Sequence, residues 1–178
     1  MAVWRFENLI PNIAEETYVA DSALIIGDVR IGEKCYIGPG AVLRGDYGKV
    51  VIGTGTSIQE NAVVHARPEE ETVVGDMVTL GHGSILHTCI VEDYAVVGIK
   101  AVVSDYALME EWSILAENSL LRKGQRLNRG EIGIGSPARV ISNIEDRPEL
   151  KEEMNTFKKK YIEMVQRYLT EGSLERLG

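Results

Sequence analysis

Residues Val19 to Leu43 read VADSALIIGDVRIGEKCYIGPGAVL and carry the clearest pattern in the chain. Every sixth residue is a branched aliphatic, and glycine or another small or acidic residue often follows it. Repeats are sought before local structure, because a missed repeat leads to the wrong fold. A period of six matches neither the 3.6-residue period of a helix nor the simple alternation of a long strand.

The same period continues over most of the chain, which predicts an all-β solenoid. Three short flat faces would make one coil of ~18 residues, with coils stacked about 4.8 Å apart. Asp46–Val51 and Ala66–Thr72 interrupt the period, and insertions in solenoids usually map to loops. The unit Leu86–Ile90 is one residue short. The aliphatics that keep the period are Val19, Ile25, Ile31, Ile37, Leu43, Ile52, Ile58, Val64, Val74, Leu80, Leu86, Val91, Val97, Val103, Met109, Leu115 and Leu121.

A different pattern follows the solenoid. The hexads end after Ile134, and Gly135–Val140 (GSPARV) leads the chain out of the repeat. Apolar residues then recur every three or four positions, which predicts an amphipathic helix of roughly 20 residues. We expect a β-helix over residues 1–142 and, over 143–178, a C-terminal helix that packs on the solenoid within the same structural domain. The predicted stripe consists of Leu150, Met154, Phe157, Tyr161, Val165 and Tyr168.

Composition narrows the class of protein. The 178 residues fit a single domain, and the net charge of −8 argues against a nucleic acid or an anionic membrane surface as partner. No basic segment followed by a long apolar run opens the chain, so we expect neither a signal peptide nor a membrane span. Cys35 and Cys89 are not closely spaced, which favours buried, reduced thiols in a cytoplasmic protein.

The three histidines of the chain all lie between positions 65 and 87. His65 and His87 are each the second residue of a hexad, one coil apart, so their side chains should stack on one face. His82 belongs to the hexad that precedes that of His87 and falls on a different face. In a threefold trimer one face meets a different face of the next subunit, and this heterologous contact closes. His82 of one subunit would therefore complete the pair His65 and His87 of its neighbour.

Three imidazoles with an open fourth position are typical of a catalytic metal site. Gln59, expected on the face of His82 and one coil below it, could hydrogen-bond a metal-bound hydroxide or a substrate. Arg44 is expected one coil below His65, where it could form a charge pair across the interface with Asp46 and Glu60. An ion pair of Arg44 with Asp46 that only fixes the trimer geometry is an equally good interpretation.

Four segments together resemble the γ-class carbonic anhydrases, a family of the hexapeptide-repeat transferase-like superfamily. They are LRGDYGKVVIG (Leu43–Gly53), SIQENAVVH (Ser57–His65), GHGSILHTC (Gly81–Cys89) and GSPARV (Gly135–Val140). The sequence of these segments is similar to that of the branch named after phenylacetate degradation and carnitine operons. Two positions differ from the best-characterised enzymes. Tyr47 replaces the glutamate that serves the proton shuttle, and the short Ala66–Thr72 replaces a long acidic loop.

The resemblance implies a left-handed parallel β-helix of hexapeptide repeats and a homotrimer. It also implies a carbonic anhydrase (a lyase) that reversibly hydrates CO2 to bicarbonate with a metal-bound hydroxide. Zn2+ (or Fe2+ or Co2+) would be held by His65, His82 and His87 at the subunit interface. Gln59 would orient the metal-bound water, Arg44 and Asp46 would organise the interface, and Tyr161 would lean over the site from the final helix.

Three other functions fit the same residues. The first is an acyl-CoA thioester hydrolase that uses the same metal site. The second is a hexapeptide-repeat acyltransferase with one histidine as general base and no metal. The third is a non-catalytic trimer in which the ion only holds the subunits together.

Overall fold

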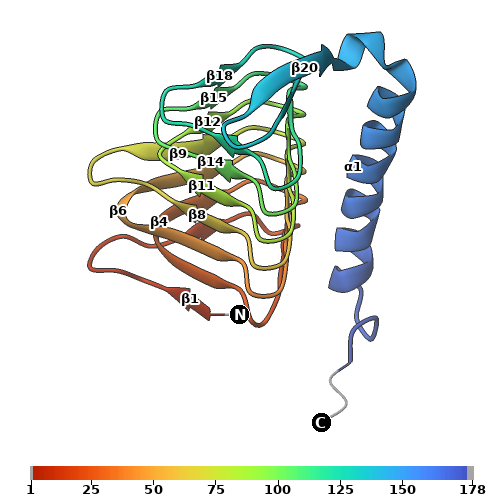
Figure 1. Cartoon of the computed structure of the whole chain (residues 1–178). Helices are drawn as coiled ribbons and strands as arrows, with labels where there is room; N and C mark the ends of the chain where they lie inside the picture. The colour runs from red at the N-terminus through yellow and green to blue at the C-terminus, as the bar shows by residue number, and fades with distance from the viewer. Residues whose placement is uncertain (1, 176–178) are drawn as a thin grey trace.

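The computed structural model describes residues 2–175, in which a stack of triangular coils is flanked by one long helix (Figure 1). Residue 1 and residues 176–178 lie outside the described residues. The last three belong to the expected C-terminal segment 143–178. The stack has about seven turns and is a left-handed parallel β-helix of hexapeptide repeats. The fold class predicted from the six-residue period and from the family resemblance is confirmed.

Each coil contributes one short strand to each of three faces. Face 1 is built from β1 (Ala2–Trp4), the first halves of β4 (Leu24–Ile31) and β6 (Val42–Ile52), β8 (Val63–His65), β11 (Ile85–His87), β14 (Val102–Val103) and β17 (Leu120–Leu121). Face 2 is built from β2 (Asn12–Ile13), the second halves of β4 and β6, β9 (Glu71–Val74), β12 (Ile90–Val91), β15 (Leu108–Met109) and β18 (Arg126–Leu127).

Face 3 is built from β3 (Tyr18–Val19), β5 (Tyr36–Ile37), β7 (Ser57–Ile58), β10 (Thr79–Leu80), β13 (Val96–Val97), β16 (Ile114–Leu115), β19 (Glu131–Ile134) and β20 (Arg139–Asn143). The pairings between coils are parallel, and β20 turns back to pair antiparallel with β19. Residues 135–138, within the predicted exit segment, make that turn.

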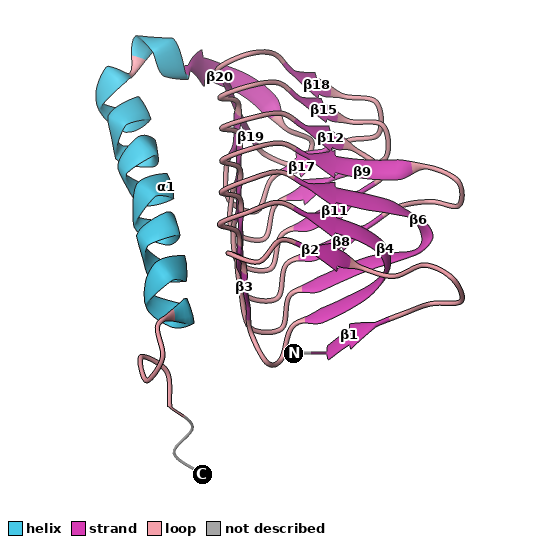
Figure 2. Cartoon of the chain, turned by 180° about the vertical axis from the view of Figure 1, so that it is seen from behind, coloured by secondary structure: helices cyan, strands magenta, loops and turns pink. Residues whose placement is uncertain are grey.

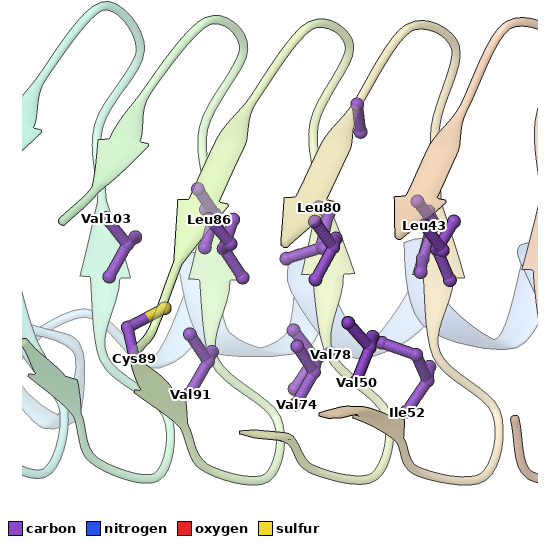
Figure 3. Close-up of a cluster of buried hydrophobic side chains, with 14 of the residues drawn as sticks. Leu43, Val50, Ile52, Val74, Val78, Leu80, Leu86, Cys89, Val91 and Val103 are labelled. Atoms are coloured by element: carbon purple, nitrogen blue, oxygen red, sulfur yellow. The ribbon is translucent and has the colours of Figure 1, made fainter. Parts of the chain in front are cut away.

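The periodic aliphatics point into the centre of the coils. Leu43, Leu86 and Val103 project from different coils of face 1 toward the strands of the other faces (Figure 3). Nearly all the other members of the period are fully buried as well, and Leu127 extends the period by one unit beyond the predicted run. Fully burying such a side chain is worth about 1.5–3 kcal/mol, so the inward column drives the stacking.

The corners of the coils need unusual backbone conformations. Gly27 has φ +78°, and a Cβ placed there would lie 2.3 Å from the carbonyl oxygen of Gly45. Only glycine fits such a close approach of two backbones. At this corner β4 and β6 bend from face 1 to face 2 without a break.

The two predicted interruptions behave differently. Ala66–Thr72 forms a projecting loop between β8 and β9, as expected of an insertion, with β9 beginning at Glu71 (Figure 1). The expectation of a loop at Asp46–Val51 is wrong, because β6 runs through these residues as one bent strand. The extra residues pair with neighbouring strands and therefore lengthen the coil instead of leaving it.

A short 3-10 helix, η1 (Ile144–Asp146), leads into α1 (Pro148–Leu169), which runs along face 3 back toward the first coil (Figures 1 and 2). Lys151 lies over the ring of Trp112 at 4.8 Å, and Tyr168 stacks on Tyr18 with ring centroids 4.4 Å apart. At about 1.5 Å per residue, the helix covers roughly 25 Å between these contacts, close to five coil spacings. The length of the helix between these contacts therefore matches the height of the coils that it covers.

One of the six members of the predicted apolar stripe of α1 is wrong. Phe157 is 47% exposed, whereas Lys158, expected on the polar side, is 3% exposed. The four-carbon stem of a lysine is itself apolar and can pack against a face as a hydrocarbon does. Spacing alone did not distinguish the two neighbours. Among the described residues, no helix is long and apolar enough to cross a membrane.

Candidate metal centre

Two of the three histidines stack on face 1. His65 ends β8 and His87 ends β11, and the two are paired in register between adjacent coils. Their ring centroids are 5.2 Å apart with an interplanar angle of 41°. Arg44 of β6 occupies the same register position one coil below His65. The column Arg44, His65, His87 has the order that the hexad count predicts.

His65 lies between an arginine and a carboxylate. Arg44 Nη1 donates to Asp46 Oδ2 at 2.8 Å, and Arg44 Nη2 lies 3.4 Å from His65 Nδ1. His65 Nε2 lies 3.3 Å from Asp46 Oδ1. Burial, and then the Arg44 guanidinium, lower the pKa of His65, which favours the neutral imidazole. Burial opposes ionisation of Asp46, but the hydrogen bond and charge of Arg44 hold its pKa below the usual value.

His87 is held by a carboxylate of the next coil. Its Nδ1 lies 2.5 Å from Asp105 Oδ1, and Arg67 Nη1 lies 3.2 Å from the other oxygen of that carboxylate. Arg67 belongs to the loop between β8 and β9, whereas Asp105 follows β14. A carboxylate at Nδ1 fixes the tautomer and leaves Nε2 free to bind.

His82 has the same kind of partner at a different corner. It lies in the turn between β10 and β11, where the coil enters face 1. Its Nδ1 is 2.5 Å from Glu60 Oε2, and the Tyr36 hydroxyl donates to Glu60 Oε1 at 2.9 Å. Burial, and then the hydrogen bond to Glu60, raise the pKa of Tyr36, so this hydroxyl stays protonated and donates.

Gln59 lies in the hexad one coil below that of His82, as expected, but one residue out of register with His82. Ile58 pairs with Leu80, which places Gln59 opposite Gly81 and Glu60 opposite His82. Gln59 is instead 7% exposed, and its Nε2 donates to the Tyr161 hydroxyl at 2.8 Å. The amide and the phenol from α1 thus form one partly buried contact beside the corner that carries His82.

The chain brings together two histidines and separates the third. His82 is at the corner where a coil enters face 1, and His87 is at the corner where the same coil leaves it. Among residues 2–175, no group of three His, Cys, Asp or Glu side chains is placed to hold a metal ion within one chain. The donor chemistry nevertheless fits a divalent cation, because His82 and His87 each have a carboxylate at Nδ1 and an imidazole is a good ligand for zinc, iron or cobalt.

Four partners of this centre were missed or only partly considered in the sequence, namely Glu60, Tyr36, Asp105 and Arg67. Glu60 was considered only as a charge partner across an interface. The coil length could have found it, because it sits one coil below His82. No sequence pattern indicated the role of Tyr36, because its hydroxyl reaches Glu60 from a strand of another coil.

The two cysteines are structural. Cys35 and Cys89 are free and buried. Burial raises the pKa of the Cys35 thiol to about 11 and that of Cys89 to about 12. The expectation of buried, reduced thiols is confirmed, and neither residue contributes a thiolate to the centre.

The coil geometry and the histidine column define a hexapeptide-repeat protein, and comparisons with known proteins narrow this class. The chain is 38% identical to the carnitine operon protein CaiE of Escherichia coli K12 over 167 residues, which cover 94% of this chain and 84% of CaiE. No family model matches the chain.

Two solved structures have the same fold over nearly their full length. One is a hexapeptide transferase family protein from Anaplasma phagocytophilum, with a TM-score of 0.89, 38% identity and coverage of 94% of this chain and 98% of that chain. The other is a putative acetyltransferase from Bacillus cereus, with a TM-score of 0.88, 30% identity and coverage of 94% and 96%. The chain belongs to the γ-class carbonic anhydrase-like superfamily of hexapeptide-repeat proteins, in its carnitine operon branch.

Proposed function

We propose that the protein is a cytoplasmic homotrimer with a metal-dependent, carbonic anhydrase-like activity, the reversible hydration of CO2 to bicarbonate. The observation that carries the proposal is the arrangement of the histidines. His65 and His87 are stacked at one corner of face 1, and His82 is at the other corner with its own carboxylate partner. A heterologous contact repeated around a threefold axis would bring His82 of one subunit to the pair of the next.

The surface of face 1 supports the trimer. An outward-facing aliphatic ladder runs one position before the inward aliphatics, and the histidine column runs one position after them; the ladder's members are neighbours in successive coils. A continuous apolar stripe on a free face marks an interaction surface. The ladder consists of Val42, Val63, Ile85, Val102 and Leu120.

In this proposal His65, His82 and His87 hold Zn2+, Fe2+ or Co2+. A divalent ion supplies a coordinated water whose pKa falls toward about 7, so that hydroxide is present at neutral pH. His82 and His87 would bind through Nε2, because Glu60 and Asp105 occupy Nδ1. His65 would have to carry its proton on Nδ1 instead of Nε2, and so leave its contacts with Asp46 and Arg44. Gln59, held by Tyr161, would present an amide to the substrate beside this corner.

The test combines metal analysis with a rate measurement. We expect close to one equivalent of metal per chain in the wild type, with His82→Ala losing it although that side chain is outside the stacked pair. Stopped-flow CO2 hydration of metal-loaded protein should then exceed that of the variant. Metal well below one third of an equivalent would overturn the metal site, and equal rates for the wild type and His82→Ala would overturn the activity.

An acyltransferase is the second candidate, because two relatives are described as a hexapeptide transferase family protein and a putative acetyltransferase. The pair His82 and Glu60 has the geometry of a histidine general base oriented by a carboxylate. Transfer from acetyl-CoA to a panel of amines and alcohols by chelator-treated protein would favour this function. Cleavage of acyl-CoA only by metal-loaded protein would instead favour the thioester hydrolase.

A further inference from the structure

Both oxygens of the Glu60 carboxylate are engaged. Oε2 lies 2.5 Å from His82 Nδ1, and Oε1 accepts from the Tyr36 hydroxyl at 2.9 Å. Because the Tyr36 hydroxyl holds Oε1, the carboxylate can rotate only about that hydrogen bond. This restriction directs Oε2 at the imidazole of His82. Tyr36 therefore restricts the orientation of the Glu60 carboxylate and, through it, the orientation of the His82 ring.

The anchor is needed because the other two groups are not buried. The side chain of His82 is 48% exposed and that of Glu60 is 34% exposed. Two half-exposed side chains would lose rotamer entropy on pairing and gain little from an attraction that water screens. Tyr36, in contrast, is 4% exposed, so its hydroxyl is a fixed point against which the pair can be ordered.

Helix α1 holds this fixed point in place. The Tyr36 ring lies 5.4 Å from the ring of Tyr161 in an edge-on contact and 5.9 Å from that of Tyr168. Tyr18 stacks on Tyr36 from the coil below, with centroids 5.6 Å apart. Tyr161 also accepts from Gln59, so the docked helix touches both the amide and the tyrosine.

We infer that Tyr36 is a positioning residue that acts through Glu60 to orient His82 for cation binding, with helix α1 holding the Tyr36 ring. The inference rests on the proposed metal site. It assigns the helix a role in the site through a residue outside the histidine constellation. His87 has a matching arrangement, in which Arg67 occupies the second oxygen of Asp105.

A double-mutant cycle on the full-length protein tests the inference. The variants are Tyr36→Phe, Glu60→Gln and the two combined, with Tyr18→Phe as the matched control that loses a neighbouring hydroxyl and keeps Glu60 intact. The readouts are the Kd for Zn2+ by chelator competition and the visible absorption bands of the Co2+-loaded protein. Circular dichroism and light scattering verify the fold and the assembly of each variant.

Changes at residues that hold metal ligands typically weaken affinity 10–100-fold. We expect Tyr36→Phe to raise the Kd about 10-fold and to change the Co2+ bands, and Tyr18→Phe to do neither. In the Glu60→Gln background Tyr36→Phe should add little, because contacting residues that act through one another are not additive. Fully additive effects, or equal Kd values for Tyr36→Phe and Tyr18→Phe, would overturn the inference. Absence of metal from the wild type would overturn the proposed function itself, and the inference with it.

Discussion

At the scale of single residues, each histidine of the centre is defined by what lies at its ring nitrogens. Glu60 and Asp105 engage Nδ1 of His82 and His87 at 2.5 Å, whereas His65 has an arginine at Nδ1 and a carboxylate at Nε2. The first arrangement leaves Nε2 free for a cation, whereas the second would free Nε2 of His65 only after its proton moved to Nδ1. The partners thus decide which histidines are ready to bind.

Asp105→Asn tests the carboxylate that holds His87. The substitution keeps the size of the side chain and removes its charge, so we expect the Kd for Zn2+ to rise 10–100-fold. Chelator competition measures this, with Glu117→Gln as a control away from the histidine column. An unchanged Kd in Asp105→Asn would show that this carboxylate does not orient a ligand.

The buried thiols give a second prediction at this scale. A thiol reacts as the thiolate, and Cys35 and Cys89 have pKa values of about 11 and about 12 because burial penalises the charged form. At pH 8 the native protein should therefore react negligibly with a disulfide reagent, and two equivalents should react after unfolding in urea. Rapid reaction of one thiol in the native protein would contradict the burial.

At the scale of elements, α1 brings an amine into the interface with face 3. Lys158 Nζ lies 3.4 Å from both Thr79 Oγ1 and the Ala95 carbonyl oxygen. Burial lowers its pKa from 10.5 to about 7, and burial is the only cause of the shift. The helix therefore docks with an amine that costs free energy to keep charged.

This amine makes stability depend on pH. The folded pKa lies below the unfolded value, so the unfolded chain binds more protons between pH 7 and 10.5 and stability rises with pH across that window. The slope is at most about 1.4 kcal/mol per pH unit, and it vanishes below about pH 7, where both states are protonated. Acidification below about pH 7 therefore removes no stabilising contribution of Lys158.

Lys158→Met should remove the slope. We expect the variant to be more stable than the wild type at pH 7, with the difference shrinking toward pH 9.5. Urea unfolding at one fixed protein concentration measures it, because assembly would make stability concentration-dependent. The neighbouring, exposed Lys159→Met should match the wild type at both pH values. A difference between Lys158→Met and wild type that does not change with pH would contradict the titration of this amine.

At the scale of the whole molecule, two faces expose aliphatic side chains to a similar degree. Ile85 on face 1 is 43% exposed and Ile90 on face 2 is 47% exposed. Only face 1 carries the histidine column beside its aliphatic ladder. The assembly proposed above joins the His82 corner of face 1 in one subunit to the His65 and His87 corner in the next, and it does not use Ile90 of face 2.

The matched pair Ile85→Arg and Ile90→Arg tests which face assembles. A charge buried in an interface without a partner is strongly unfavourable, so Ile85→Arg should shift the molar mass to that of one chain and abolish metal binding with it. Ile90→Arg should leave both unchanged. Light scattering and metal analysis give the two readouts. Dissociation by Ile90→Arg, or a stable trimer in Ile85→Arg, would place the interface elsewhere.

Much of the fold could be predicted from the sequence. The hexad aliphatics set the coil length, and with it the register that stacks His87 above His65. This works because inward positions in a solenoid are selected by burial alone, which a residue's hydrophobicity reports directly. In the stripe of α1 only Phe157 was wrong, and Lys158 is buried in its place because a lysine stem can be buried as well as an aromatic ring.

The sequence by itself determined the repeat, the coil that carries each histidine and the chemical nature of the candidate ligands, since these depend on the residues and their periodicity along one chain. The tertiary structure decided which groups hold those histidines and Gln59. Tyr36 reaches Glu60 across 24 residues and Tyr161 reaches Gln59 across 102. Such contacts depend on side-chain direction and on how α1 docks along the stack. Neither leaves a period in the sequence, because each is made once and by a single pair.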